Sequence, residues 1–500
     1  MSITGPGSIT AANLTAQNAM FNQLTTLSEE LGTGDASQTY SGLGSQAGLA
    51  LELGAQLSAI NGYSNTTNNV TTTLGVAQSV LTQIGDVGSS MAQSISNQGS
   101  FTLDNNGQTQ AQITAEGDLD QILSLLNTQV GSNYLFSGSA VNEPSTASTD
   151  AILNGTGTQA GLTQIIAQRQ AADLGANNMG RLTVGLTGST VTVSQDGSPF
   201  GFVLAGVNSS LTGATASGPT GSPPSISVNL TSNPNPGDSI EFQFTLPDGS
   251  SQTITLQAAN AQPPGANQFS IGTNYTQTAG NLQTALNTAI GNLAQTTLPA
   301  ASAIVAAQNF FTGNPPQRVA GPPYDTSMAL VNGTAANTVF WYTGEDGSTP
   351  ARQTQTAQVG PSMTIDYGMR ANEQAFTSLL ANIGALAASS FTASNPDAQA
   401  SYQALSQSVE QNLAGQSGTQ SVADIEADLA NAQTTVQNAN TINTQTQNTL
   451  QDMQQGIEGV NQNQIGEQIL TLQNTLSASM SVTARLAQLS LVNFLAPVSG

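Results

Sequence analysis

The chain has 500 residues, only 7% of them charged, and 29 acidic residues against six Arg give a formal net charge of −23. Scattered Arg residues cannot supply the clustered positive charge that nucleic acid requires, and an anionic membrane surface would repel the chain. Lys, His and Cys are absent, which excludes disulfides, thiolate metal sites and nucleophilic catalysis by these side chains. The composition therefore predicts a protein without a nucleic-acid partner, a cofactor or a metal.

The first residues lack the basic and apolar regions of a secretory signal, and no stretch approaches 18 apolar residues. We therefore expect no membrane insertion. The chain is expected either to stay in the cytosol or to leave the cell without a cleaved signal peptide.

The N-terminal part reads as helical. Residues 8–31 carry apolar side chains at steps of three and four residues, and a Gly-rich stop follows at 32–35. A longer helix is predicted over 49–95, where heptad spacing persists. Asp104–Gly107 indicates a turn, and a third helix is expected to run to about Tyr134.

The middle of the chain changes character. Between 141 and 360 Gly, Pro, Ser and Thr become frequent, and apolar residues alternate with polar ones as in strands. Pro247-Asp248-Gly249 lies between two such segments and indicates a hairpin. One helix is predicted around 282–290, and Val339–Tyr342, which holds the only Trp, is predicted as a strand. We expect a β-rich domain at 141–360, either single or made of two modules that meet near 215–235.

The C-terminal part returns to helical spacing. Shorter helices are expected around 376–383 and 402–413, and one long helix is predicted over 421–495. Its apolar positions follow at steps of three and four residues, with Asn443 and Thr446 in the same register. This is the pattern of a coiled-coil seam.

Neither helical end can bury so narrow a stripe alone, so we expect the two ends to pack on each other. The predicted fold is α + β, a long antiparallel helical coiled coil or bundle built from 1–140 and 361–500, with the β-rich domain inserted. The residues expected to carry the helix contacts and the assembly of subunits are Leu24, Leu27, Leu31, Leu53, Ile60, Leu74, Leu81, Leu429, Val436, Leu450, Met453, Ile457, Leu472, Leu476, Leu489 and Phe494.

Six short tracts stand out, five in the two helical ends and one near the end of the β-rich middle. They are Leu31–Asp35, Ala47–Leu51, Tyr134–Gly138, Trp341–Asp346, Tyr367–Glu373 and Leu489–Leu495. Together they resemble the bacterial flagellin family, most of all the hook–filament junction proteins (hook-associated protein 3 type) of alphaproteobacteria. The resemblance covers about 1–140 and 360–500, and the middle matches nothing. The chain departs from the family in lacking Arg and Lys in its first helix and in the turn that follows.

The resemblance implies a structural, self-assembling subunit of the bacterial flagellum that joins hook to filament and is not an enzyme. Its partners would be copies of itself, other flagellar axial proteins (hook-associated proteins and flagellin) and an export chaperone. It would leave the cell through the flagellar type III apparatus, reside outside it, and order its ends when subunits join. The alternatives are a main filament flagellin and a surface-displayed carbohydrate-binding module on a helical stalk.

Several acidic residues invite a second interpretation. For Asp424–Asp428 a capped helix start, with Ser421, is favoured over a metal site, because alternate residues point to different faces. Asp104–Gly107 is favoured as a turn over a calcium loop, because no Glu follows at the required distance. A glycosidase site made of two carboxylates is chemically possible in the β-rich domain, but no specific residue indicates one. Asp35 and Glu345–Asp346, in Gly-rich loops, are expected to be solvated.

The remaining candidates are aromatic or basic. Trp341 with Tyr342 is favoured as part of a small core over a ligand platform. Arg370 and Arg485 are each expected to pair with a carboxylate of a neighbouring helix. Because the predicted helix contacts are apolar groups and amides, an assembled polymer is expected to survive acid; drift under a compositional bias is the competing explanation for the missing Lys and His.

Overall fold

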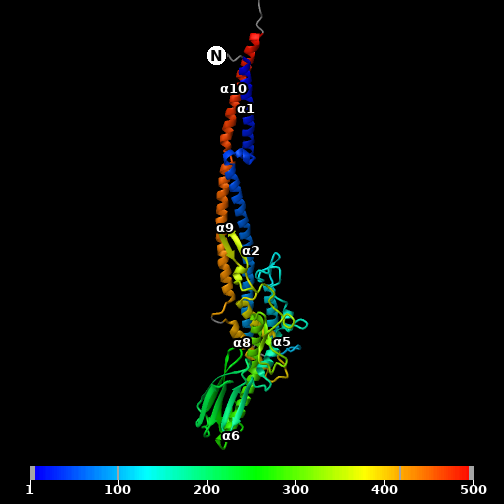
Figure 1. Cartoon of the computed structure of the whole chain (residues 1–500), viewed down its shortest axis with the longest axis vertical. Helices are drawn as coiled ribbons and strands as arrows, with labels where there is room; N and C mark the ends of the chain where they lie inside the picture. The colour runs from blue at the N-terminus through cyan, green and yellow to red at the C-terminus, as the bar shows by residue number, and fades with distance from the viewer. Residues whose placement is uncertain (1–5, 98–100, 416–417, 495–500) are drawn as a thin grey trace, which may run out of the picture. The chain divides into compact units, whose positions relative to one another are not determined.

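The computed structural model describes residues 6–97, 101–415 and 418–494, apart from the side chains of 6–10, 97 and 489–494. It is 54% helical and 17% strand, with helices at both chain ends and a sheet-rich middle (Figure 1). This confirms the mixed class and the helical, sheet-rich, helical order predicted from the sequence.

The helices are α1 (Pro6–Thr33), η1 (Tyr40–Gln46), α2 (Ala47–Asn97), α3 (Gln110–Leu126), α4 (Thr149–Asn154), α5 (Leu162–Leu174), α6 (Tyr275–Thr312), η2 (Ala351–Thr354), α7 (Gln374–Ala388), α8 (Ala398–Leu413), α9 (Val422–Glu458) and α10 (Gln462–Phe494). The strands are β1 (Gln129–Val130), β2 (Asn133–Tyr134), β3 (Leu182–Thr187), β4 (Thr190–Gln195), β5 (Val203–Ser209), β6 (Ala214–Thr220), β7 (Ser225–Leu230), β8 (Ser239–Thr245), β9 (Ser251–Ala259), β10 (Gln268–Ser270), β11 (Gln317–Val319), β12 (Leu330–Asn332), β13 (Thr356–Gly360) and β14 (Met363–Asp366).

The chain divides into two compact units, which we describe separately. The helical unit comprises Met1–Thr71, Gln358–Ile365 and Thr435–Gly500. The mixed unit comprises Thr72–Ala357 and Asp366–Thr434. The division falls within α2 and within α9, where the composition of the chain shows no change.

Segments from opposite ends of the chain pair in the helical unit. α1 lies beside α10 (Figure 1), and Gln17 Nε2 donates to the hydroxyls of Ser479 (3.3 Å) and Thr483 (3.0 Å). Farther along, Gln447 of α9 donates to Asn61 of α2 at 3.0 Å. Because residue 17 meets 479–483 and residue 61 meets 447, the paired helices run antiparallel, as expected.

Both helical paths of this unit break where they face each other. Val460 N–H donates to the Gly34 carbonyl (2.9 Å) and Ala36 N–H to the Glu458 carbonyl (2.6 Å). Gly34 has a φ of +81°, which favours glycine. At Gly459 a Cβ would lie 2.5 Å from a carbonyl of the preceding turn. The prediction of one uninterrupted C-terminal helix is therefore wrong: the backbone leaves the helix here to bond across to the other chain end.

Two four-stranded sheets form the body of the mixed unit. Their strand orders are β3-β4-β7-β6 and β10-β9-β8-β5, and the neighbours are antiparallel except for the parallel pair β9 and β10. β8 and β9 pair from Thr245 opposite Ser251, across a turn that contains Asp248 and Gly249. The predicted hairpin is confirmed.

One apolar core joins both sheets to α6. Alternate side chains of β7 and β8, such as Val228 and Phe242, are buried in it together with Leu282 and Leu286 of the helix. The segment 215–235 comprises most of β6, all of β7 and the turns beside them, and the inward faces of both strands pack in this core. Because neither sheet has a separate core, the core gives no support to the alternative of two modules that meet there.

Two further predictions fail locally. α3 ends at Leu126 instead of near Tyr134, because Asn127 turns away to bond with Thr146 through its side chain (2.8 and 3.0 Å), and a short hairpin of β1 and β2 follows. Val339–Tyr342 is not a strand. Its Trp is only 2% exposed and donates from Nε1 to the Phe311 carbonyl at 3.0 Å, so packing sets this segment.

Candidate assembly surface

The paired terminal helices bury little of themselves. Among residues 11–33 of α1 only Gln17 and Leu27 are buried, and among residues 462–488 of α10 only Ile465 and Leu476. Helices in proteins take most of their stability from the packing of an apolar face. The α1–α10 pair therefore leaves unburied much of the side-chain surface that could stabilise its helices by packing.

The predicted contact residues fall into four groups. Nine are buried: Leu27, Leu53, Ile60, Leu74, Leu81, Leu429, Val436, Leu450 and Leu476. Leu24, Ile457 and Leu472 are half-buried. Leu31 and Met453 are exposed by 36% and 48%. Leu489 and Phe494 lie in α10, but their side chains are outside the described residues. Leu53 and Ile60 of α2 form a small cluster with Leu450 of α9.

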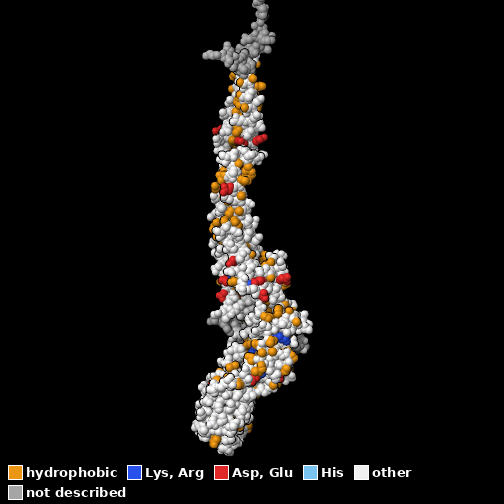
Figure 2. Space-filling view, viewed as in Figure 1, with side chains coloured by type: hydrophobic (Ala, Val, Ile, Leu, Met, Phe, Trp, Pro, Cys, Tyr) orange, Lys and Arg blue, Asp and Glu red, His pale blue; other side chains and the backbone are white. Residues whose placement is uncertain are grey.

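Exposed large apolar side chains concentrate on the helical unit. This unit has fewer than a third of the residues but 11 of the 18 such side chains described. Figure 2 shows apolar groups recurring along the visible face of the paired helices. Contiguous exposed apolar groups mark interaction sites more often than isolated ones do. We call these residues the assembly surface: Leu14, Phe21, Leu31, Tyr40, Leu49, Leu51, Ile442, Met453, Leu470, Met480 and Val482.

Most polar side-chain contacts within the helical unit join amides, hydroxyls and backbone carbonyls, and the carboxylates of Glu52 and Glu458 accept from Gln of their own helices. Asn443 is 2% exposed and donates from Nδ2 to the Val359 carbonyl of β13 at 2.9 Å. The sequence shows Asn443 only as a polar residue in the seam, because its partner lies 84 residues away. Among the described residues of this unit there is no ion pair.

The cations of the chain are distributed in the opposite way. Five of the six Arg lie in the mixed unit and bond there: Arg169, Arg181, Arg318, Arg352 and Arg370. Arg485 of α10 is exposed and has no carboxylate partner among the described residues, so its predicted pairing is wrong. Arg370 does pair, but with Glu345 of a loop and not with a helix.

Three tracts of the resemblance meet in the mixed unit. Gly138 N–H donates to the Met369 carbonyl and Glu345 N–H to the Ser137 carbonyl, each at 2.9 Å, and Arg370 forms an ion pair with Glu345. The expectation that Glu345 is solvated is wrong. Its side chain is only 22% exposed, and that of its partner Arg370 is 9% exposed. We call this the three-tract node, formed by 134–138, 341–346 and 367–373.

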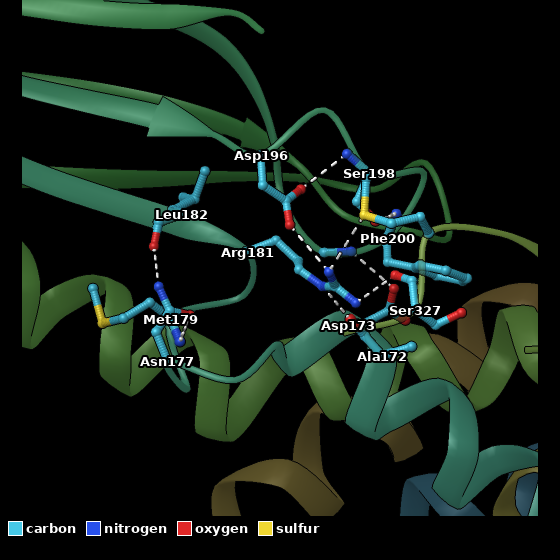
Figure 3. Close-up of polar contacts among 12 residues, drawn as sticks. Ala172, Asp173, Asn177, Met179, Arg181, Leu182, Asp196, Ser198, Phe200 and Ser327 are labelled. Atoms are coloured by element: carbon cyan, nitrogen blue, oxygen red, sulfur yellow. Dashed lines mark hydrogen bonds and ion pairs between the residues drawn. The ribbon is translucent and has the colours of Figure 1, made fainter. Parts of the chain in front are cut away.

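A second charge cluster, buried except for Asp196, lies between α5 and the sheets (Figure 3). Arg181 donates to Asp196 (3.0 Å) and to the carbonyls of Ala172 (2.6 Å) and Ser327 (2.8 Å). Asp173 accepts from Gly201 N–H at 2.8 Å and also pairs with an Arg of its own helix. The two carboxylates of the cluster, those of Asp173 and Asp196, therefore connect the sheets to α5, and their oxygens are engaged in these bonds. The glycosidase alternative gains no support from this cluster.

The acidic helix start and the predicted turn are as expected. Asp424 accepts from the N–H and hydroxyl of Ser421 (2.8 Å each), and these hydrogen bonds lower the pKa of Asp424. Asp104 accepts from the N–H groups of Asn106 and Gln108 at 2.9 Å. In the described part of the chain no three acidic residues cluster as a metal site would require. Within the same residues, no helix has the length and apolar character to cross a membrane.

Comparisons with known proteins add no relative. No family model matches the chain, and no curated protein matches it significantly.

Proposed function

We propose that the protein is a structural, self-assembling subunit of the bacterial flagellum, of the flagellin family, that joins hook to filament. The observation that carries the proposal is the assembly surface. Exposed apolar groups cover antiparallel helices from the two chain ends, and these helices bury too little against each other. Neighbouring copies that pack on them, in coiled-coil fashion, would supply the missing burial.

The proposal assigns the rest of the molecule as well. The helical unit makes the axial contacts with copies of the chain and with other axial proteins, and the mixed unit decorates the outside. No enzymatic step is involved. Export without a cleaved signal peptide and location on the extracellular flagellum follow from the same family assignment.

Arg485 offers a direct probe of assembly. It is the one exposed Arg among the described residues, and it lies on α10. Trypsin should cut the unassembled chain after Arg485, because thinly packed helix ends open readily. Addition of sheared flagellar fragments should protect the bond and raise the helicity measured by circular dichroism. The variant Arg485→Gln has no trypsin-sensitive peptide bond at this position, so loss of cleavage in this variant identifies the site.

Paired variants connect this result to the assembly surface. Phe21→Gln with Leu470→Gln changes side chains that are 47% and 62% exposed, so the single chain should fold normally but remain unassembled and cleavable. Val203→Thr with Val331→Thr, at similarly exposed positions of the mixed unit, should assemble like the wild type. Electron microscopy of long filaments would assign a filament flagellin, and short capped ends a junction protein. A wild-type chain that stays soluble and cleavable beside the fragments would overturn the proposal.

A further inference from the structure

A cavity of about 380 Å³ lies in the mixed unit beside the loop that follows α6. Pockets for small ligands start at roughly 300 Å³. The lining combines aromatic rings with amides, hydroxyls and one carboxylate, and it includes Phe311, Asn314, Phe340, Trp341, Asp346 and Asn372.

The aromatic residues of the cavity have two distinct roles. Trp341 is held by its hydrogen bond to Phe311, and the two rings pack at 5.3 Å between centroids. Its 2% exposure makes it part of the frame, as the sequence favours. Phe340 is 38% exposed, so its ring is the one offered to a ligand.

The polar groups leave hydrogen-bonding capacity unused. Asn372 is half-buried, and its side-chain amide has no hydrogen bond among the described residues. Asp346 is exposed and receives one long hydrogen bond, from Asn314 at 3.4 Å. Two amides supply both donors and acceptors, and the carboxylate supplies acceptors alone.

We propose that this cavity binds a neutral saccharide of one or two rings. No Arg lines it, and its one charge is negative, so an anionic ligand is disfavoured. A simple cation would use Asp346 but leave the amide donor of Asn372 without a partner. Each sugar hydroxyl both donates and accepts, and the C–H face of a pyranose fits the negative face of the Phe340 ring.

The site is independent of the proposed flagellar role, because none of its residues belongs to the assembly surface. Trp341 is the single Trp of the chain and lines the cavity, so its fluorescence reports binding without a label. The full-length chain is titrated with glucose, galactose, mannose and N-acetylglucosamine, with lactose and maltose as two-ring probes. We expect at least one of them to give a saturable change.

Three variants test the assignment. Phe340→Ala and Asp346→Ala should each weaken binding about tenfold or more, because one removes the stacking ring and the other a charged acceptor. Val331→Ala, at a 43% exposed position outside the cavity, should bind like the wild type. An unchanged Trp341 emission maximum without sugar shows that each variant is folded.

Three results would overturn the proposal. One is the absence of a saturable response to every sugar. Another is a response to tetramethylammonium with none to the sugars, which would assign the cavity to a cation held by the aromatic rings and Asp346. Sugar binding that survives both cavity substitutions would also overturn it, by placing the site elsewhere.

Discussion

Removing one partner of the ion pair in the three-tract node should strongly destabilise the mixed unit. Arg370→Met would leave the Glu345 carboxylate largely buried without its cation, and it would remove a 2.7 Å hydrogen bond to the Gly347 carbonyl. Removing one partner of a buried pair typically costs about 3–5 kcal/mol. Because the Glu345 side chain is 22% exposed to solvent, we expect the free energy of unfolding to fall by an amount near the lower end of this range, about 3 kcal/mol.

The measurement is urea unfolding followed by Trp341 fluorescence, which reports the mixed unit alone. Glu345→Leu should be destabilising like Arg370→Met. The double variant should recover much of the loss, because a buried pair replaced by apolar groups is often close to neutral. Asp346→Asn, the exposed neighbouring carboxylate, should stay within about 0.5 kcal/mol of the wild type. Single variants with the wild-type midpoint, or a double variant as unstable as both losses added, would refute the reasoning.

Two other predictions concern pH. Burial raises the pKa of Asp118 in α3, and its Oδ2 has no hydrogen-bond partner among the described residues. The folded state then binds this proton more tightly than the unfolded state, so the stability it gives is present at low pH and lost as pH rises. Asp118→Asn should therefore raise the urea midpoint at pH 7 but not near pH 3; a lower midpoint at pH 7 would contradict this. If the proposed assembly is correct, the polymer should persist near pH 3, since the described contacts of the helical unit include no ion pair; sedimentation that shows free subunits there would count against it.

The sequence predicts the helices and strands wherever one periodicity runs long enough to fix the buried face. The heptad spacing of α2 predicts its extent to within two residues at each end, and the alternation in β8 and β9 with Asp248-Gly249 between them predicts their hairpin. The end of α3 and the break between α9 and α10 escape this reasoning. Each is set by a partner distant in the sequence, Thr146 for Asn127 and Gly34 for Val460.

The candidate sites, too, are predictable where they depend on local spacing and unpredictable where they depend on partners distant in the sequence. Apolar spacing alone selects Leu53, Ile60 and Leu450, which do cluster, but spacing cannot tell that Leu31 and Met453 remain exposed. That depends on how much of a helix its partner covers. The cavity at Phe340 has no linear signal, because its lining comes from the end of α6, two loops and Asn372.

The two units differ in the kind of polar contact that they use, and this difference affects which of them can fold alone. The mixed unit holds its five Arg in ion pairs and hydrogen bonds, and it has a core that joins two sheets and α6. Partly buried ion pairs need fixed, complete surroundings, so they suit a unit whose partners all lie in the same chain. The helical unit instead combines amide and hydroxyl bonds, such as Gln17 to Thr483, with exposed apolar groups. Amides present both donors and acceptors to any neighbour and apolar groups need no directional partner, so a surface of this kind can be completed by another subunit without leaving a charge unpaired.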